Sequence, residues 1–399
     1  MKVLDPPVVL RQPLDFSLVM GGPLYQLWRR TRLSGDGLDL PYRRLTALVL
    51  ITWLPLLILS ALSGHALGVA VDLPFLRDIE AHARFLVALP LLIVAEPIVH
   101  LRTHGVIRRF MERRIVATDD LPRFGEAIDW AVRARNSIPL EVALLIVAWT
   151  VGHWVWRSQI ALSTDTWYFV QEGTRWQLTP AGNWYAFVSV PVFQFILLRW
   201  YVRLFIWFAL LFRVSRLSLC LTASHPDRAG GLSFLGKTSY AFAPVIVAQG
   251  ALLAGVIANR VMYQGANLVS FKMEALALVG CLVLIVLGPL VMFTPQMAVA
   301  KRKALADYGL LATHYVQGFE EKWIRGSELS TNELIGTADI QSLADLNNSY
   351  DVVRQMRLVP FGWEDVTRLA LATAAPLVPL GLLVLSLQDL VLKLVKILF

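Results

Sequence analysis

Apolar residues gather along the chain in blocks of roughly 20, the length that a helix rising about 1.5 Å per residue needs to cross roughly 30 Å of hydrocarbon. Charged residues are frequent only between these blocks. Backbone groups in lipid must be satisfied within their own segment, which favours helices. The pattern predicts an all-α, polytopic membrane helix bundle with about seven spans. They are expected at about Leu45–Leu67, Arg84–Leu101, Ile138–Trp156, Trp184–Phe212, Ser239–Ala258, Glu274–Phe293 and Val366–Leu385.

The polar segments predict three further elements. A surface helix is expected at about Leu121–Arg135. Between the third and fourth spans, β-forming residues flank Glu172-Gly173-Thr174, which predicts a small outer hairpin loop. Helical character continues after the sixth span, with a further helix at about Asp339–Met356. The chain then divides into a cytoplasmic or interfacial N-terminal segment (1–44), a membrane domain of six spans (45–298), a helical cytoplasmic domain (299–364), and a last span with an interfacial tail (365–399).

The N-terminal segment contains an amphipathic stretch around Phe16–Leu33. Its apolar side chains, including Trp28, are expected in the membrane interface, with basic residues such as Arg30 reaching lipid headgroups. Arg43 and Arg44 are expected to mark the cytoplasmic boundary of the first span. The fourth block is longer than the hydrocarbon core is thick, so part of its helix should be tilted or project beyond the membrane.

Composition and charge agree with a membrane protein. Hydrophobic residues make up 56% of the chain and the mean hydropathy is +0.57, whereas soluble domains are about 45–50% apolar. The net charge is +8, but the basic residues lie beside the apolar blocks, which favours the lipid bilayer over nucleic acid as the partner. The segments predicted to be inside carry 27 Lys and Arg and the outer loops 6. This asymmetry predicts a cytoplasmic N-terminus. The basic residues comprise 29 Arg and 8 Lys, a bias that suits a GC-rich bacterial genome, so a bacterial inner membrane is expected.

Ionisable residues within spans are candidate functional groups, because each costs about 2.5–3.5 kcal/mol or more in the bilayer. Glu96 and His100 lie four residues apart on one helix face. They could form a proton relay or cation site. Alternatively, they could stabilise a kink at Pro97 or extend their polar groups to the inner membrane interface. Arg199 and Arg203 are also four residues apart. They could attract an anion, pair with Glu96, or belong to an inner belt of aromatic and basic residues.

The third span contributes two more ionisable residues. Glu141 and His153 fall near its opposite ends. His153 is a candidate member of the intramembrane polar site, although both residues could instead lie at the membrane interfaces.

A cytoplasmic connection contains the unusual sequence His225-Pro-Asp-Arg-Ala-Gly-Gly. His225, Asp227 and Arg228 could bind a lipid headgroup at the membrane surface. Alternatively, the segment is a structured turn that caps the helix after the fourth span, with Asp227 and Arg228 paired. One His and one Asp do not make a metal site. The chain also lacks the sequence motifs of nucleotide, flavin and metalloenzyme sites, so no cofactor is expected.

Three segments carry a resemblance to a known family. They are His225-Pro-Asp-Arg-Ala-Gly-Gly-Leu-Ser-Phe-Leu, Gly336-Thr-Ala-Asp-Ile-Gln-Ser-Leu-Ala-Asp-Leu and Arg357-Leu-Val-Pro-Phe. The chain resembles, from about residue 20, a family of uncharacterised multi-span proteins of bacterial inner membranes. That family has no assigned activity, so the resemblance implies a location and no function.

Three functions stay open from the sequence. The intramembrane charges favour a channel or transporter for an ion or small solute, which could be a homo-oligomer. The helical segment 299–364 favours a non-catalytic scaffold or sensor. The cytoplasmic His225 loop favours, more weakly, a membrane enzyme that acts on lipid, since no nucleophile or metal motif accompanies it. We therefore expect a protein that is not an enzyme.

Overall fold

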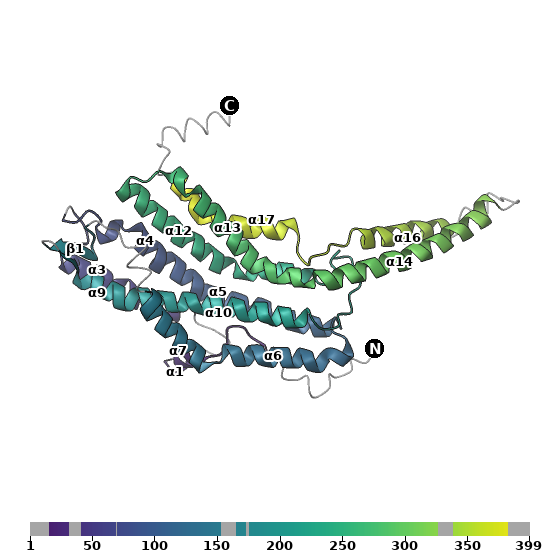
Figure 1. The fold of residues 1–399 in the computed structure, drawn as a ribbon, viewed down its shortest axis with the longest axis horizontal. Coiled ribbons are helices and arrows are strands. Elements are labelled where there is room, and N and C mark those ends of the chain that lie inside the picture. The colour runs from purple at the N-terminus through teal and green to yellow at the C-terminus, as the bar shows by residue number, and fades with distance from the viewer. Residues whose placement is uncertain are drawn as a thin grey trace, which may run out of the picture.

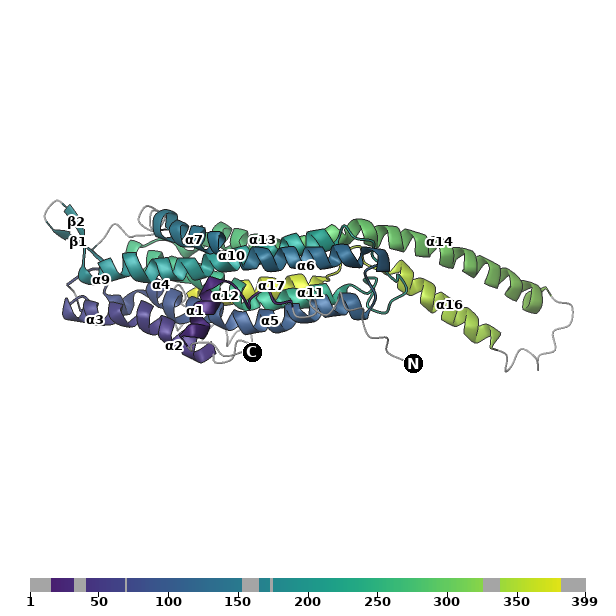
Figure 2. The ribbon, with the colours of Figure 1, turned by 90° about the horizontal axis from the view of Figure 1, so that it is seen from below.

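The computed structural model describes residues 16–31, 41–68, 70–152, 165–172, 175–325 and 338–381. These residues form an elongated bundle of helices, with a two-helix arm projecting from one end (Figures 1 and 2). A two-stranded hairpin lies at the opposite end. We refer to the two ends as the hairpin end, which carries β1 and β2, and the arm end, which carries α14 and α16.

The α-helices and strands named below have the following bounds. They are α1 Pro23–Arg30, α2 Pro41–Thr52, α3 Leu54–Leu62, α4 Ile79–His82, α5 Leu89–Glu112, α6 Leu121–Arg135, α7 Ile138–Val147, β1 Phe169–Glu172, β2 Arg175–Leu178, α9 Pro180–Trp184, α10 Val190–Val214, α11 Ser233–Ser239, α12 Ala243–Gln264, α13 Lys272–Leu287, α14 Thr294–Phe319, α16 Asp339–Arg354 and α17 Trp363–Ala374. Short π- or 3₁₀-helical stretches join several of them into longer helices.

Five helices among the described residues are long and apolar enough to cross a membrane. They are Tyr42–Leu62, Ile79–Glu112, Pro180–Val214, Ser233–Gln264 and Leu268–Ile324. They correspond to the predicted spans 1, 2, 4, 5 and 6, so the helical fold and five helices able to cross a membrane are confirmed.

Seven spans are not confirmed. The apolar helix Ile138–Thr150 is too short to be counted as a span, and the rest of predicted span 3 lies outside the described residues. α17 changes into a 3₁₀-helical stretch at Ala375–Leu380. Pro376 and Pro379, which have no backbone N–H to donate, lie within this stretch.

Several helices continue far beyond the predicted spans. Pro180–Val214 has 35 residues and Leu268–Ile324 has 57, which correspond to roughly 52 Å and 86 Å of helix. Only part of each length fits within hydrocarbon. The arm-end half of α10 packs against the predicted surface helix, α6, which begins and ends at Leu121 and Arg135 as expected. Phe124, Ala127, Ile128 and Ala131 form the buried face of α6.

The hairpin end is held by a close contact between the hairpin and α9. β1 and β2 pair antiparallel, with Phe169 opposite Leu178. Thr179 caps α9 by accepting from the Gly182 N–H at 2.9 Å, and its hydroxyl donates to the Trp167 carbonyl at 2.7 Å. A Cβ atom on Gly182 would lie 2.0 Å from the Tyr168 carbonyl oxygen. Only glycine allows α9 to approach the hairpin so closely.

α12 lies against α4, α5 and α17 in the middle of the bundle. Two of its glycines meet backbone atoms of neighbouring helices. A Cβ on Gly250 would lie 2.2 Å from the Thr373 carbonyl oxygen of α17, and one on Gly255 would lie 2.9 Å from the Glu80 Cα of α4. Small residues are the usual means by which membrane helices approach this closely.

The arm consists of the end of the 57-residue helix and the antiparallel α16. The predicted helix at Asp339–Met356 is confirmed, since α16 covers Asp339–Arg354. At the tip, Lys322 forms an ion pair with Asp339 at 2.7 Å and the Tyr315 hydroxyl donates to the Asp339 carbonyl at 2.9 Å. At the base, the Lys301 ammonium donates to the Met356 carbonyl at 2.7 Å. These contacts hold α16 along the 57-residue helix, which continues from the bundle into the arm.

Candidate functional site

A buried ion-pair cluster is centred on Glu96 of α5. Arg203 Nη1 of α10 donates to Glu96 Oε1 at 2.9 Å, and Arg44 Nη1 of α2 forms a second ion pair with Glu96 Oε2. The three side chains are 3%, 6% and 0% exposed, in the order Glu96, Arg203, Arg44. One carboxylate therefore joins three helices in the interior of the bundle.

A second carboxylate extends the cluster to α7 and α1. Arg199 Nη2 of α10 lies 3.1 Å from Glu141 Oε1 of α7. The other oxygen of Glu141 accepts from the Leu24 N–H in the first turn of α1 at 2.9 Å. Backbone N–H groups at a helix start have no partner within the helix, so a carboxylate placed there stabilises it. Glu141 thus links the position of α1 to an arginine of the cluster.

Trp28 of α1 lies beneath two of these arginines. The guanidinium carbons of Arg44 and Arg199 lie 5.0 and 5.9 Å from the Trp28 ring centroid, within the range of cation–π interaction. The interfacial position expected for Trp28 is wrong, because its side chain is buried. The Arg44 side chain, expected at the cytoplasmic boundary of the first span, points into the bundle toward Glu96.

Arg135, the last residue of α6, completes the cluster at its edge. Its guanidinium donates to the Ser17 carbonyl. Burial, followed by the positive charge of Arg203, lowers the pKa of Arg135 to about 10. The side chain is therefore still protonated at pH 7. We refer to Arg44, Arg135, Arg199, Arg203, Glu96 and Glu141 together as the arginine cluster.

The arginine cluster carries more positive than negative charge. Its four guanidinium groups face two carboxylates, an excess of two positive charges among the described residues. A cavity of about 20 Å³ lies among Arg135, Arg199, Arg203 and Glu141. A volume of this size holds about one water molecule. The charged side chains of the cluster thus leave little free space between them.

His100 has a different partner from Glu96, although both lie on one face of α5. Its Nδ1 lies 2.8 Å from the Ser17 hydroxyl oxygen, in the segment before α1. Glu96 is bound by Arg44 and Arg203. The pairing of Arg203 with Glu96 is therefore confirmed. Glu96 and His100 bind different partners, so these contacts do not form a direct relay between them. The predicted site residue His153 lies outside the described residues.

A second buried polar cluster lies at the hairpin end. Asp78 accepts from the Asn259 amide and the Trp167 indole, each at 2.8 Å, and from the Ala81 N–H at 3.0 Å. Two residues on, Glu80 forms an ion pair with Arg84. We call Asp78, Glu80, Arg84, Asn259 and Tyr185 the hairpin-end cluster.

Sequence reasoning missed the hairpin-end cluster. The predicted second span begins at Arg84, which leaves Asp78 and Glu80 in the outer connection before it. The helix instead begins at Ile79, with Asp78 as its N-cap. The Arg84 guanidinium donates to the Tyr185 hydroxyl. Both residues lie in π-helical stretches, Ala83–Ala88 and Tyr185–Ser189. Such wider turns occur frequently at functional sites.

The loop after α10 is organised by Asp227. Its carboxylate accepts from the N–H groups of Ala229, Gly231 and Ser233 at 2.9, 3.1 and 3.1 Å. Burial opposes ionisation, but these backbone donors outweigh it and lower the pKa of Asp227 below its usual range. The Ser233 contact caps the start of α11. The predicted turn is therefore present, but it serves the helix that follows the loop and not the one before it.

The predicted Asp227–Arg228 pair is wrong. The ring nitrogen of His225 lies 2.9 Å from the Asp227 carboxylate. Arg228 has a left-handed backbone, with φ of 53°, and its carbonyl accepts from the Arg357 N–H at 2.8 Å. These contacts attach the loop to the base of the arm and favour a structural role for it.

Among the described residues, no group of three or more His, Cys, Asp and Glu side chains could hold a metal ion. The chain matches no protein-family model, no curated protein and no solved structure. Its resemblance to a family of inner-membrane proteins therefore stays a prediction.

Proposed function

We propose that the protein is a channel or transporter for a small anion, and that the arginine cluster is its gate. The observation that carries this proposal is the excess of guanidinium groups over carboxylates in the arginine cluster, where Arg44, Arg199 and Arg203 are buried and Arg135 is partly buried. Uncompensated buried charge is costly, and charged residues inside membrane proteins commonly mark the paths of ions. An anion that enters the cluster would compensate the excess.

The placement of the second cluster supports a gated path. Arg84 and Glu96 lie in the same helix, Ile79–Glu112, and twelve residues of helix separate them by roughly 18 Å. The two clusters thus lie at two levels along this helix, one on each side of the segment between Arg84 and Glu96. Gates at two levels let a transport path be closed at one level while the other opens.

The proposed orientation follows the charge asymmetry of the sequence. The arm end carries the segments rich in Lys and Arg, so we propose that it faces the cytoplasm of a bacterial cell and that the protein lies in the inner membrane. The arginine cluster then lies toward the cytoplasmic side. The hairpin-end cluster lies toward the outer side.

Anion flux into proteoliposomes tests the transport proposal. We expect the purified protein to conduct a small anion such as chloride in preference to potassium. Arg135→Gln should lower this preference about fivefold, the factor that corresponds to roughly 1 kcal/mol of lost electrostatic attraction. Flux of both ions is measured under an imposed gradient, with ionophore controls.

Arg133→Gln is the matched control. Arg133 lies two residues before Arg135 in the same helix, but its side chain is exposed and hydrogen-bonds only to the Asp129 carbonyl among the described residues. It should leave the chloride preference unchanged. The anion proposal fails if the wild-type protein shows no flux, or if both variants change selectivity equally.

The arm favours a second candidate function, that of a scaffold that assembles through its cytoplasmic helices. Leu310, Leu311 and Ile324 are exposed apolar residues on the arm, which projects from one end of the bundle (Figure 1). We propose that a second copy of the chain covers them. An apolar surface in water favours association.

Size measurement in detergent tests this second candidate. We expect an oligomer for the wild-type protein and for Gln317→Glu, which adds charge at an exposed polar position of the same helix. Leu311→Glu should shift the population toward the monomer. A monomeric wild-type protein would refute assembly through the arm.

A further inference from the structure

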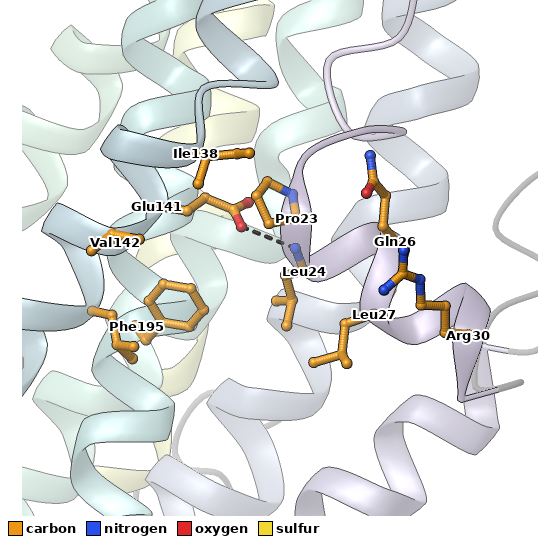
Figure 3. A pocket seen from close by; sticks show the side chains of 10 residues that line it. Pro23, Leu24, Gln26, Leu27, Arg30, Ile138, Glu141, Val142 and Phe195 are labelled. Carbon is orange, nitrogen blue, oxygen red and sulfur yellow. Dashed lines mark hydrogen bonds between the residues drawn. The ribbon is translucent and has the colours of Figure 1, made fainter.

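A largely apolar groove of about 520 Å³ lies between α1, α7 and α10 (Figure 3). This volume falls within the range of small-molecule sites, roughly 300–1,000 Å³. Leu24 and Leu27 of α1 form one wall, Val142 and Leu145 of α7 the other, and Phe195 of α10 contributes an aromatic ring. The groove is therefore suited to a flexible hydrocarbon chain.

The groove opens beside an exposed apolar surface, which suits contact with lipid. α7 contains no buried residue, and its exposed side chains are almost all apolar, including Ile138, Val142, Leu145 and Ile146. A helix with this surface is stable only where the surrounding medium is apolar. The groove can thus be entered from the bilayer without passing through water.

The polar residues of the groove lie mainly on α1. Gln26 and Arg30 lie on α1 on the opposite side of the groove from Phe195 (Figure 3). Arg30 is exposed, and no acidic side chain of the described residues pairs with it. A guanidinium group at a membrane surface matches the phosphate of a lipid in both charge and geometry.

We propose that this groove binds one acyl chain of an anionic phospholipid, with the lipid phosphate on Arg30. The apolar walls hold the chain, and Arg30 selects for negative charge. This lipid site is independent of the proposed transport activity, because lipid binding requires no ion flux. It also reaches the arginine cluster, since Glu141 lines the groove, accepts from the Leu24 N–H of α1 and forms the ion pair with Arg199. A bound lipid therefore holds α1 against the residue that positions Arg199.

Spin-labelled lipids test the site in nanodiscs. We expect labelled phosphatidylglycerol to be immobilised by the protein more strongly than labelled phosphatidylcholine. Arg30→Gln should reduce this preference about fivefold, since one basic residue near a membrane surface contributes about 1 kcal/mol toward an anionic lipid. Arg102→Gln, an exposed arginine on α5 that does not line the groove, should leave it unchanged.

A photoactivatable acyl chain locates the bound lipid. We expect the label to appear on peptides that contain Val142 or Leu145, and Leu145→Trp, which fills the groove, should abolish that labelling while the protein stays folded. Equal immobilisation of both lipids by the wild-type protein would overturn the proposal. The proposal would also be overturned if Leu145→Trp left the labelling unchanged. Crosslinks from Val142 to residues 1–15 would overturn it as well, because they would show that the N-terminal segment of the protein fills the groove.

Discussion

Glu96→Gln is expected to lower the free energy of unfolding by about 3–5 kcal/mol, the cost of removing one partner from a buried ion pair. Glutamine has nearly the shape of glutamate and can still accept hydrogen bonds. It cannot offset the positive charges of Arg44 and Arg203, both of which are buried beside it. Denaturation in mixed micelles, followed by tryptophan fluorescence, measures the change.

Glu112→Gln is the control for this prediction. It removes a carboxylate from the same helix, where Glu112 forms an exposed ion pair with Arg108 one turn away. Exposed pairs of this spacing contribute about 0.3–0.5 kcal/mol. Equal effects of the two substitutions would mean that the charge of Glu96 is not needed to hold the arginine cluster together. A loss of stability confined to Glu96→Gln supports the cluster as a joint between α2, α5 and α10.

Gly250→Ala is expected to destabilise the protein by about 1–3 kcal/mol, the usual cost of inserting a methyl group into a filled interface. The new Cβ would lie 2.2 Å from the Thr373 carbonyl oxygen and 3.3 Å from Pro376. The obstacle is backbone and a rigid ring, so α17 must move away from α12. The same denaturation measurement reports the loss. Accessibility of a cysteine introduced at Thr373 reports the displacement of α17.

Gly280→Ala separates this packing effect from the intrinsic preference of alanine for helix. Gly280 lies in α13, and a Cβ there would meet no atom within 4 Å. Alanine in such a position should leave stability unchanged or raise it by up to about 1 kcal/mol. If Gly250→Ala behaves like Gly280→Ala, the close approach of α17 to α12 is wrong. The attachment of this last apolar helix to the bundle would then need revision.

The pairing of Arg203 with Glu96 could be predicted because both residues are charged and both fall within long apolar blocks. Groups of opposite charge in such places have few alternatives to each other. Arg44 gave no such signal. Its position in the first turns of a span is also typical of an arginine at the headgroups, and 52 residues separate it from Glu96. Only the packing of α2 against α5 brings the two side chains together.

The hairpin-end cluster was missed for a related reason. Asp78 and Glu80 are close to a predicted loop, where acidic residues are common, and their buried partners come from remote elements. Asn259 follows Asp78 by 181 residues in the chain. A local pattern cannot reveal that a loop residue caps a buried helix. The turn at Asp227 was predictable from its glycines, whereas the contacts of Arg357 with this loop depended on the position of the arm.

The sequence by itself determined that this is a membrane protein built from helices. The length of an apolar block and the need to satisfy backbone groups in lipid are local properties, and they predicted five of the spans, α6 and α16. Only the tertiary structure decided which charges are buried together and where α1 lies. Those outcomes depend on contacts between residues far apart in the chain. Such contacts form only when the packed helices bring the side chains within a few ångströms of one another.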